Sequence, residues 1–207
     1  MVGPNEVSDA NHLAEERKPL GWHWRGYHPH LDEPGRLQSV GFRLADSVPN
    51  HLLKRWRAEV EACRDEVRAA KFHRLVSRFE DTGYGACHLR QPAVASMVEE
   101  ALFFGDGDAY RLIDWCVMPN HVHVLLQPER PLPGIMRAWK AVTARRANRI
   151  LRRTGRFWMA DYYDRFIRDD RHLEAVQRYI RQNPVAAGLC REPHHWPWSS
   201  ARYRHVE

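Results

Sequence analysis

The segment from Asp114 to Pro128, DWCVMPNHVHVLLQP, decides which fold is to be expected. Strand-forming residues fill both of its halves, and the turn-forming pair Pro119-Asn120 separates them. We therefore predict two strands joined by a tight turn. In the second strand, His121 and His123 point to the same face of the sheet, with Cα atoms about 7 Å apart.

The other face of this strand is predicted to belong to the hydrophobic core, because Val122, Val124 and Leu126 all point to it. The two imidazoles either converge on one metal ion or are polar residues on a solvated sheet face. A structural zinc site is not favoured, because few soft ligands are nearby and Cys116 shares the face only if the turn keeps the register.

Hydrophobic patterning before this segment predicts one strand and two helices. The strand lies within residues 36–46, where apolar residues alternate. One long amphipathic helix is predicted over residues 49–80, in which apolar residues recur at steps of three and four: Leu52, Trp56, Val60, Cys63 and Val67. A second helix is predicted over residues 91–106, with Pro92 in its first turn.

The pattern after the segment predicts a helix over residues 132–155 and a strand over residues 162–168. A last helix, capped by Asp169 or Asp170, is predicted to end at Asn183, because the following proline disfavours helical geometry there. The order of elements indicates an α+β fold, with helices covering a mainly antiparallel sheet of about four or five strands.

The composition points to a polyanionic partner. The formal net charge is +6 and the pI is about 9.4, which suits nucleic acid or an acidic membrane surface. All but four of the 32 basic residues are arginines, whose planar guanidinium groups match phosphate oxygens. A GC-rich coding bias would explain the arginine excess equally well.

The length of 207 residues predicts one domain. Residues 1–37, rich in Pro, Gly, His and charge, are predicted to form an N-terminal arm, and residues 38–207 the folded domain. The four cysteines have no paired spacing and are predicted to be free thiols. Without a signal-like segment or an apolar run of about 18 residues, we expect a soluble, cytoplasmic protein with no membrane partner.

The predicted last helix carries a second group of candidate site residues. Leu173, Val176 and Ile180 form its apolar stripe, whereas Tyr179 and Asn183 are four residues apart and share another face. Packed across the sheet, this helix could bring a phenol and an amide oxygen to a metal held by the histidines. Tyr179 could also be an interface aromatic.

Four motifs together carry a family resemblance: WCVMPNHVHVLLQP, GRFWMADYYDRFIRDDRHL, YIRQNPVAAGL and the terminal WPWSSARY. In this order and spacing, from about Gly41 to Tyr203, the chain resembles the REP-associated tyrosine transposases, bacterial relatives of the HUH single-strand transposases. The chain departs from the family pattern by the long helical region of residues 49–80 and by the N-terminal arm.

The resemblance implies a ferredoxin-like α+β domain within residues 38–207. It implies that His121 and His123 hold a divalent metal ion, Mg²⁺ or Mn²⁺, and that Tyr179 is the nucleophile. Asn183 falls where the family places a polar third ligand, although related transposases have Gln there. The implied reaction cleaves single-stranded hairpin DNA of the REP type through a 5′-phosphotyrosine link and joins strands without a nucleotide cofactor.

The predicted helix over residues 132–155 is the candidate DNA-binding element. From Arg130 to Arg156 there are nine basic residues and no acidic one, a pattern that suits a phosphate backbone better than an ordinary solvated face. The residues predicted to contact DNA are Arg137, Lys140, Arg145, Arg149, Arg152 and Arg156, of which the last four recur along one helix face. The predicted buried side contains Met136, Trp139, Val142 and Ile150.

Several alternatives stay open at this point. Trp139, Trp196, Trp198 and Tyr203 either stack on unpaired bases or pack in the protein. The chain could be a hairpin-binding relic that no longer cuts, or a nuclease that uses water, and RNA could replace DNA. We expect a monomer, with a homodimer as the alternative.

Overall fold

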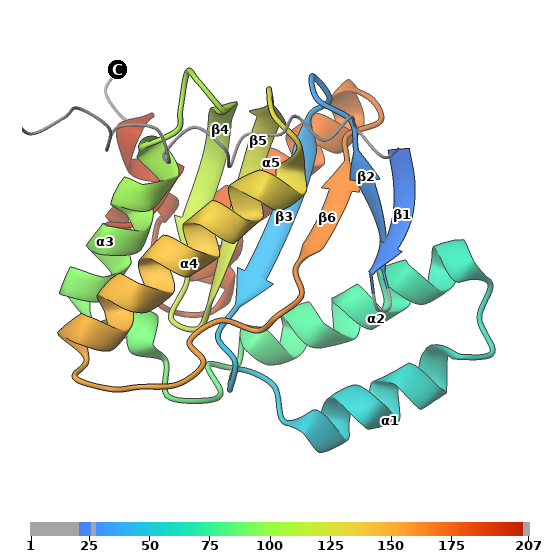
Figure 1. Ribbon diagram of the computed structural model, residues 1–207, viewed down its shortest axis with the longest axis horizontal. Coiled ribbons are helices and arrows are strands. Elements are labelled where there is room, and N and C mark those ends of the chain that lie inside the picture. Colours follow the sequence, from blue (N-terminus) through green and yellow to red (C-terminus); the bar gives the residue numbers. More distant parts are fainter. Residues whose placement is uncertain (1–20, 26–27, 205–207) are drawn as a thin grey trace, which may run out of the picture.

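The computed structural model describes residues 21–25 and 28–204 (Figure 1). The strands are β1 (Gly21–Arg25), β2 (His28–Asp32), β3 (Gln38–Arg43), β4 (Tyr110–Val117), β5 (His121–Pro128) and β6 (Tyr163–Phe166). The α-helices are α1 (Asn50–Val60), α2 (Asp65–Glu80), α3 (Pro92–Phe103), α4 (Leu132–Ile150) and α5 (Asp170–Ala186). Short 3₁₀ turns η1 (His88–Arg90), η2 (Pro193–His195) and η3 (Ser200–Tyr203) complete the order.

The main sheet has four strands in the order β4-β5-β3-β6, and every neighbouring pair is antiparallel. With helices between β3 and β4 and between β5 and β6, this is the ferredoxin-like arrangement. The predicted α+β class and the predicted strands are therefore confirmed. The turn at Pro119-Asn120 keeps the register, so that Cys116 pairs with His123 across β4 and β5.

One face of the sheet packs against α3 and α4 (Figure 1). Val122, Val124 and Leu126 of β5 lie in this core, as predicted. Trp139 of α4 is also buried there, and its indole N–H donates to the Tyr110 hydroxyl at 3.0 Å. Trp139 is thus a packing residue.

The opposite face of the sheet packs against α5. Leu125 of β5 and Cys116 and Met118 from the β4 side contact Ile180, which is fully buried. His121 and His123 lie on this face because side chains alternate along a strand. Strand alternation therefore separates an apolar core from a face that carries the imidazoles.

The single helix predicted over residues 49–80 is wrong: the chain forms two helices that pack against each other. The break lies between Val60 and Asp65, where the Arg68 guanidinium donates to the carbonyls of Glu61 and Cys63, at 2.8 and 3.1 Å. These bonds satisfy carbonyls that a continuous helix would have used. Val67, predicted in the buried stripe, is 56 % exposed.

The helix predicted over residues 132–155 ends earlier than expected, at Ile150. Arg152 adopts a left-handed φ of 49°, and the Asn148 side chain donates to the Gly155 carbonyl at 2.9 Å. This bond folds the chain back beyond the last helical turn. Val142, predicted on the buried side of the helix, is 38 % exposed, and Ile150 is also exposed.

The end predicted for the last helix is also wrong. Asp169 caps the start of α5, as predicted, by accepting from the His172 N–H at 2.7 Å. However, α5 passes through the buried Pro184 and stops only before Gly188, whose φ is 68°. The Leu189 N–H donates back to the Pro184 carbonyl at 2.9 Å, which is the pattern of a glycine-terminated helix.

The region predicted as an N-terminal arm contains a two-stranded antiparallel sheet, β1 with β2, in which Gly21 pairs with Asp32. β2 contacts β6 beside the main sheet (Figure 1). Residues 1–20 of the predicted arm lie outside the described residues. The division of the chain at residue 37 stays a prediction.

The terminal motif WPWSSARY lies against the free edge of β4. Ser199 forms a β-bridge with Cys116, and the Val117 N–H donates to the Trp198 carbonyl at 2.9 Å. The Trp196 indole donates to the Val117 carbonyl at 3.0 Å, and the Trp198 indole donates to the Ser96 hydroxyl at 3.1 Å. Both tail tryptophans are therefore packing residues.

Two expectations from the composition can be compared with the structure. All four cysteines are free thiols, as predicted. Within the described ranges, none of the helices has the length and apolar composition that crossing a bilayer requires.

A buried carboxylate joins β4, α5 and the tail. Asp114 is fully buried and accepts two hydrogen bonds from the Arg181 guanidinium, at 2.9 and 2.8 Å. The Ser200 hydroxyl donates to the same carboxylate at 2.7 Å. Such charge-assisted, two-pronged bonds fix geometry as well as adding stability.

Replacing Asp114 by alanine is expected to lower the free energy of unfolding by about 3 kcal/mol, because Arg181 and Ser200 lose their shared acceptor. Urea denaturation followed by circular dichroism would measure the change. Asp108→Ala is the matched control, because the Asp108–Arg130 pair is exposed and should contribute less than about 1 kcal/mol. Equal losses in the two variants would contradict the prediction.

Candidate active site

The two histidines lie close together and are almost completely buried. Their ring centroids are 4.6 Å apart, and the side chains of His121 and His123 are 2 % and 5 % exposed. Burial disfavours the imidazolium form, so it lowers the pKa of His123 to about 4 and the pKa of His121 well below its usual value. Both rings are neutral at physiological pH, the state in which imidazole binds metal.

Asn120 of the turn fixes the orientation of the His121 ring. The Asn120 side-chain NH₂ group donates to the carbonyls of Glu80 and Tyr84, at 3.1 and 2.9 Å. Its side-chain oxygen therefore faces His121 Nδ1, at 2.8 Å, and accepts from the N–H there. The lone pair of His121 consequently lies on Nε2, which points into the site.

The helix α5 places both predicted partners at His123. The Tyr179 hydroxyl oxygen lies 3.5 Å from His123 Nε2, and the Asn183 side-chain nitrogen lies 3.4 Å from the same atom. The structure thus brings together the four residues that the sequence proposed for the site. Their spacing of two along β5 and four along α5 is what makes them meet.

The Tyr179 side chain is partly open to solvent, at 41 % exposure, although its hydroxyl points inward. Burial of the hydroxyl and the nearby Asp81 carboxylate raise the pKa of Tyr179, against hydrogen bonds with Ser77 and Asn183. The phenol is therefore fully protonated at neutral pH and needs activation before it can act as a nucleophile.

The donor set fits a hard divalent cation. His121 Nε2 and Asn183 Oδ1 are buried and, among the described residues, have no hydrogen-bond partner. Buried polar atoms normally have hydrogen-bond partners, so two buried acceptors without a partner indicate a binding site. Two imidazoles and an amide oxygen are compatible with Mg²⁺ or Mn²⁺. A cavity of about 60 Å³ adjoins the two histidines.

Two carboxylates at the end of α2 were missed in the sequence. Glu80 is buried beside Arg43, with 3.3 Å between the charged atoms, and burial raises the pKa of Glu80 to about 8. Asp81 Oδ1 lies 3.6 Å from His121 Nε2, and burial raises the pKa of Asp81 to about 6. The sequence signal, an acidic pair at the end of a helical pattern, is too common to have indicated a site.

The predicted DNA-binding residues lie elsewhere, on and after α4, which covers the opposite face of the sheet from Tyr179. Arg137, Lys140 and Arg156 line a hollow of about 480 Å³ between α4 and the segment that follows it. The Lys140 ammonium donates to the carbonyls of Ala160 and Asp161, at 2.7 and 3.2 Å.

The four arginines predicted along one helix face are divided by the end of α4. Arg145 and Arg149 are exposed on the helix, whereas Arg152 and Arg156 follow its last residue. A continuous stripe over all four is therefore not formed. The basic surface is made by one helix and the loop after it.

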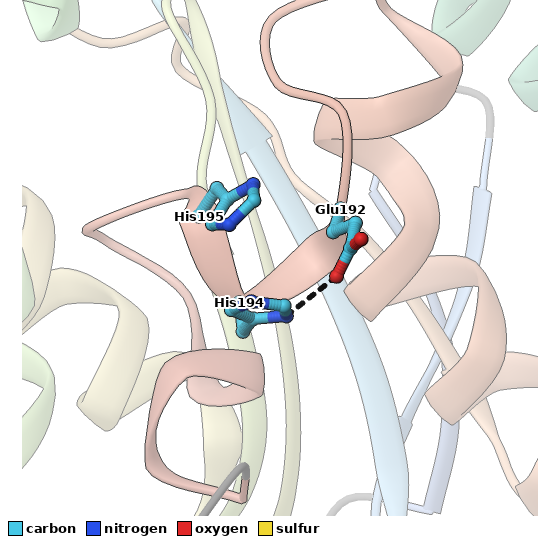
Figure 2. A group of neighbouring side chains, drawn as sticks. All are labelled: Glu192, His194 and His195. Atoms are coloured by element: carbon cyan, nitrogen blue, oxygen red, sulfur yellow. Dashed lines mark ion pairs between the residues drawn. The ribbon is translucent and has the colours of Figure 1, made fainter.

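A separate cluster of possible metal-binding side chains occurs in the C-terminal segment. In the described part of the chain, the ligand atoms of Glu192, His194 and His195 all lie within 4.8 Å of one another (Figure 2). His194 Nδ1 is 3.3 Å from a Glu192 carboxylate oxygen. This cluster contains none of the predicted ligands, and Glu192 and His195 are exposed.

The comparison with protein families bears on the segment that contains the site. Residues 99–183, from α3 to Asn183, match the family model described as "Transposase IS200 like". The chain resembles an IS200-like transposase. The match includes both histidines and Tyr179, so the resemblance drawn from the sequence motifs is confirmed.

Individual relatives agree with this family. A Haemophilus influenzae protein named as a REP-associated tyrosine transposase is 30 % identical over 103 residues, 41 % of this chain and 55 % of that protein. The chain therefore spans about half the length of this curated relative. The solved structure of a REP-associated tyrosine transposase bound to a REP hairpin aligns with a TM-score of 0.51 and 13 % identity, over 86 % of this chain and 84 % of that one. At this identity the likeness supports the fold.

In the metal-free protein, His123 is expected to titrate with a pKa of about 4, and the pKa of His121 is expected to lie well below its usual value, because the folded state disfavours both imidazolium ions. Nitrogen-15 NMR of the imidazole rings would follow both residues. A midpoint near the unperturbed value of about 6.5 for either ring would contradict the prediction.

Proposed function

We propose that the chain is a single-tyrosine DNA transposase that cleaves and rejoins single-stranded hairpin DNA. The observation that carries the proposal is the meeting of Tyr179 and Asn183 at one nitrogen of His123. A phenol beside a pair of metal-competent imidazoles suits nucleophilic attack on a phosphodiester. A retained set of all four residues also favours an active enzyme over a hairpin-binding relic.

The reaction that we propose has two transfers at phosphorus. The Tyr179 oxygen attacks the scissile phosphorus, the P–O3′ bond breaks, and the phenol proton passes to solvent, which reaches this side chain. The leaving oxygen takes up a proton and becomes a free 3′-hydroxyl, while the other fragment is held as a 5′-phosphotyrosine. The 3′-hydroxyl of a second DNA end then attacks this phosphorus and gives up its proton. The bond between phosphorus and the Tyr179 oxygen breaks, the phenol regains a proton, and the strands are joined.

The protein residues prepare this chemistry before DNA binds. When Mg²⁺ or Mn²⁺ is bound by His121, His123 and Asn183, it supplies polarisation of the scissile phosphate and stabilisation of transition-state charge. Asn120 holds His121 in the tautomer whose Nε2 can bind metal. His123 Nε2, 3.5 Å from the Tyr179 hydroxyl, orients the nucleophile towards the ligands.

The proposed substrate is hairpin DNA of the REP type. The relative of known structure that shares the fold is bound to a REP hairpin, and the basic residues on and after α4 would neutralise phosphates of such a hairpin. We assign this contact to Arg137, Lys140, Arg145, Arg149, Arg152 and Arg156. A chromosomal DNA substrate places the protein in the bacterial cytoplasm, where we propose that residues 38–207 act as a monomeric catalytic domain.

Replacing Tyr179 by phenylalanine is expected to abolish the covalent protein–DNA adduct, because the attacking oxygen is lost, while hairpin affinity changes by less than about twofold. The measurement is a denaturing gel after incubation with Mn²⁺ and end-labelled hairpins copied from palindromes flanking the gene. EDTA should also abolish the adduct.

Tyr203→Phe is the matched control, because Tyr203 is another exposed tyrosine, which lies in the tail and packs against Trp115 of β4. This variant should form the adduct at the wild-type rate. Cleavage that persists in Tyr179→Phe would point to a nuclease that uses water. Tight binding without cleavage, on hairpins that include the natural site, would support the relic.

Replacing both Arg145 and Arg149 by alanine is expected to weaken hairpin binding and to reduce the slope of log affinity against log salt concentration by about 2, since each phosphate contact contributes about one unit. Fluorescence anisotropy at several salt concentrations would measure the slope. Arg130→Ala is the control, because Arg130 is already paired with Asp108. An unchanged slope in the double variant would remove α4 from the interface.

A further inference from the structure

Asp81 lies at the C-terminal end of α2 and reaches into the same site from a third element. Its backbone N–H donates to the Ser77 carbonyl at 3.0 Å, so the last turn of α2 fixes its position. Although the whole side chain is 32 % exposed, its Oδ1 atom is buried and lies 3.6 Å from His121 Nε2.

The atoms that face each other across this gap are both acceptors. Asn120 accepts from His121 Nδ1, so Nε2 of the neutral ring carries a lone pair. Among the described residues, neither Nε2 nor Asp81 Oδ1 has a hydrogen-bond partner. Two buried acceptors without a donor between them are unfavourable, and a cation bound by both would satisfy them.

The spacing is close to that of two ligands of one ion. Neighbouring ligands of an octahedral ion at about 2.1 Å lie about 3 Å apart, so a small side-chain movement would close the gap. Asn183 Oδ1 is also buried and, among the described residues, without a hydrogen-bond partner, while the nitrogen of the same amide lies 3.4 Å from His123 Nε2. The C-cap of α2, strand β5 and helix α5 each contribute one buried acceptor without a hydrogen-bond partner: Asp81 Oδ1, His121 Nε2 and Asn183 Oδ1.

We infer that Asp81 is a further ligand of the divalent metal ion, together with His121, His123 and Asn183. This inference rests on the proposed function, and it deepens it by adding one negative charge to an otherwise neutral ligand set. A carboxylate oxygen strengthens the preference of the site for hard cations such as Mg²⁺ and Mn²⁺. The negative end of the α2 dipole lies at the same place and also favours a cation.

The inference gives the helical region of residues 49–80 a part in the chemistry. This region is where the chain departs from the resemblance drawn from its motifs. The end of α2 is held at the sheet by the Asn120 side chain, which donates to the Glu80 carbonyl at 3.1 Å, and by the Arg43–Glu80 ion pair. The residue that directly follows this region, at the C-cap of α2, thus supplies a side chain to the site.

The test measures metal binding by the full-length protein without DNA, by titrating Mn²⁺ and following free Mn²⁺ by electron paramagnetic resonance. Asp81→Asn, which keeps the shape and removes the charge, is expected to weaken Mn²⁺ binding at least tenfold. Asp108→Asn removes the same charge from an exposed position at the far end of β4 and should leave the affinity unchanged. His123→Ala reports the loss of an imidazole ligand.

The outcomes separate this inference from the proposed function. If Asp81→Asn binds Mn²⁺ with wild-type affinity while His123→Ala loses Mn²⁺ binding, the inference is overturned and the proposed function is left intact. Weakened binding in Asp81→Asn, in a protein that cuts no hairpin, supports the inference and counts against the function. No saturable Mn²⁺ binding by the wild-type protein overturns both. If Asp81→Asn unfolds, shown by its circular dichroism spectrum, Asp81→Ser replaces it with the same expectation.

Discussion

The paired bonds between Asp114 and Arg181 are the constraint on which the site depends. Asp114 is buried on β4, and the Arg181 guanidinium donates two hydrogen bonds to its carboxylate. Because the guanidinium is planar, this two-pronged contact fixes the angle and the position of α5 along the sheet. Arg181 lies between Tyr179 and Asn183 in the chain, so the same contact sets where both side chains meet His123. Ser200 donates to this carboxylate as well, which explains why a motif at the end of the chain accompanies a site in its middle.

The site also depends on the difference between the two faces of one strand. Alternation along β5 sends Val124 into the core with α4 and His123 towards α5. Because the core side is closely packed, β5 cannot slip by one residue without exchanging valines for histidines. The register that stabilises the fold is therefore the register that presents the imidazoles. Asn120, in the adjoining turn, adds the choice of tautomer to this geometry.

Local patterns in the sequence predicted most of the fold, and the resemblance carried by the motifs singled out the four central site residues. Periods of two and four place His121 with His123, and Tyr179 with Asn183, without knowledge of any distant contact. The predicted helix bounds were wrong where a side-chain hydrogen bond or tertiary packing overrides a local sequence pattern. Arg68 divides the predicted helix, and buried Pro184 is accommodated within α5. Which sheet face α4 covers, and what lies next to the end of α2, depend on tertiary packing, so Asp81 could not be found from its neighbours.

The burial of the ligands and the exposure of the nucleophile differ in a way that suits a phosphate in a flexible strand. His121, His123 and Asn183 are almost fully buried, whereas the Tyr179 ring is 41 % exposed. A phosphate that contacts the Tyr179 hydroxyl, 3.5 Å from His123 Nε2, would lie directly beside these ligands. A single strand can bend its backbone towards these buried ligands more easily than a paired stem can. The basic residues on and after α4 lie on the other side of the sheet, so a hairpin that touches both must pass around the edge of the domain.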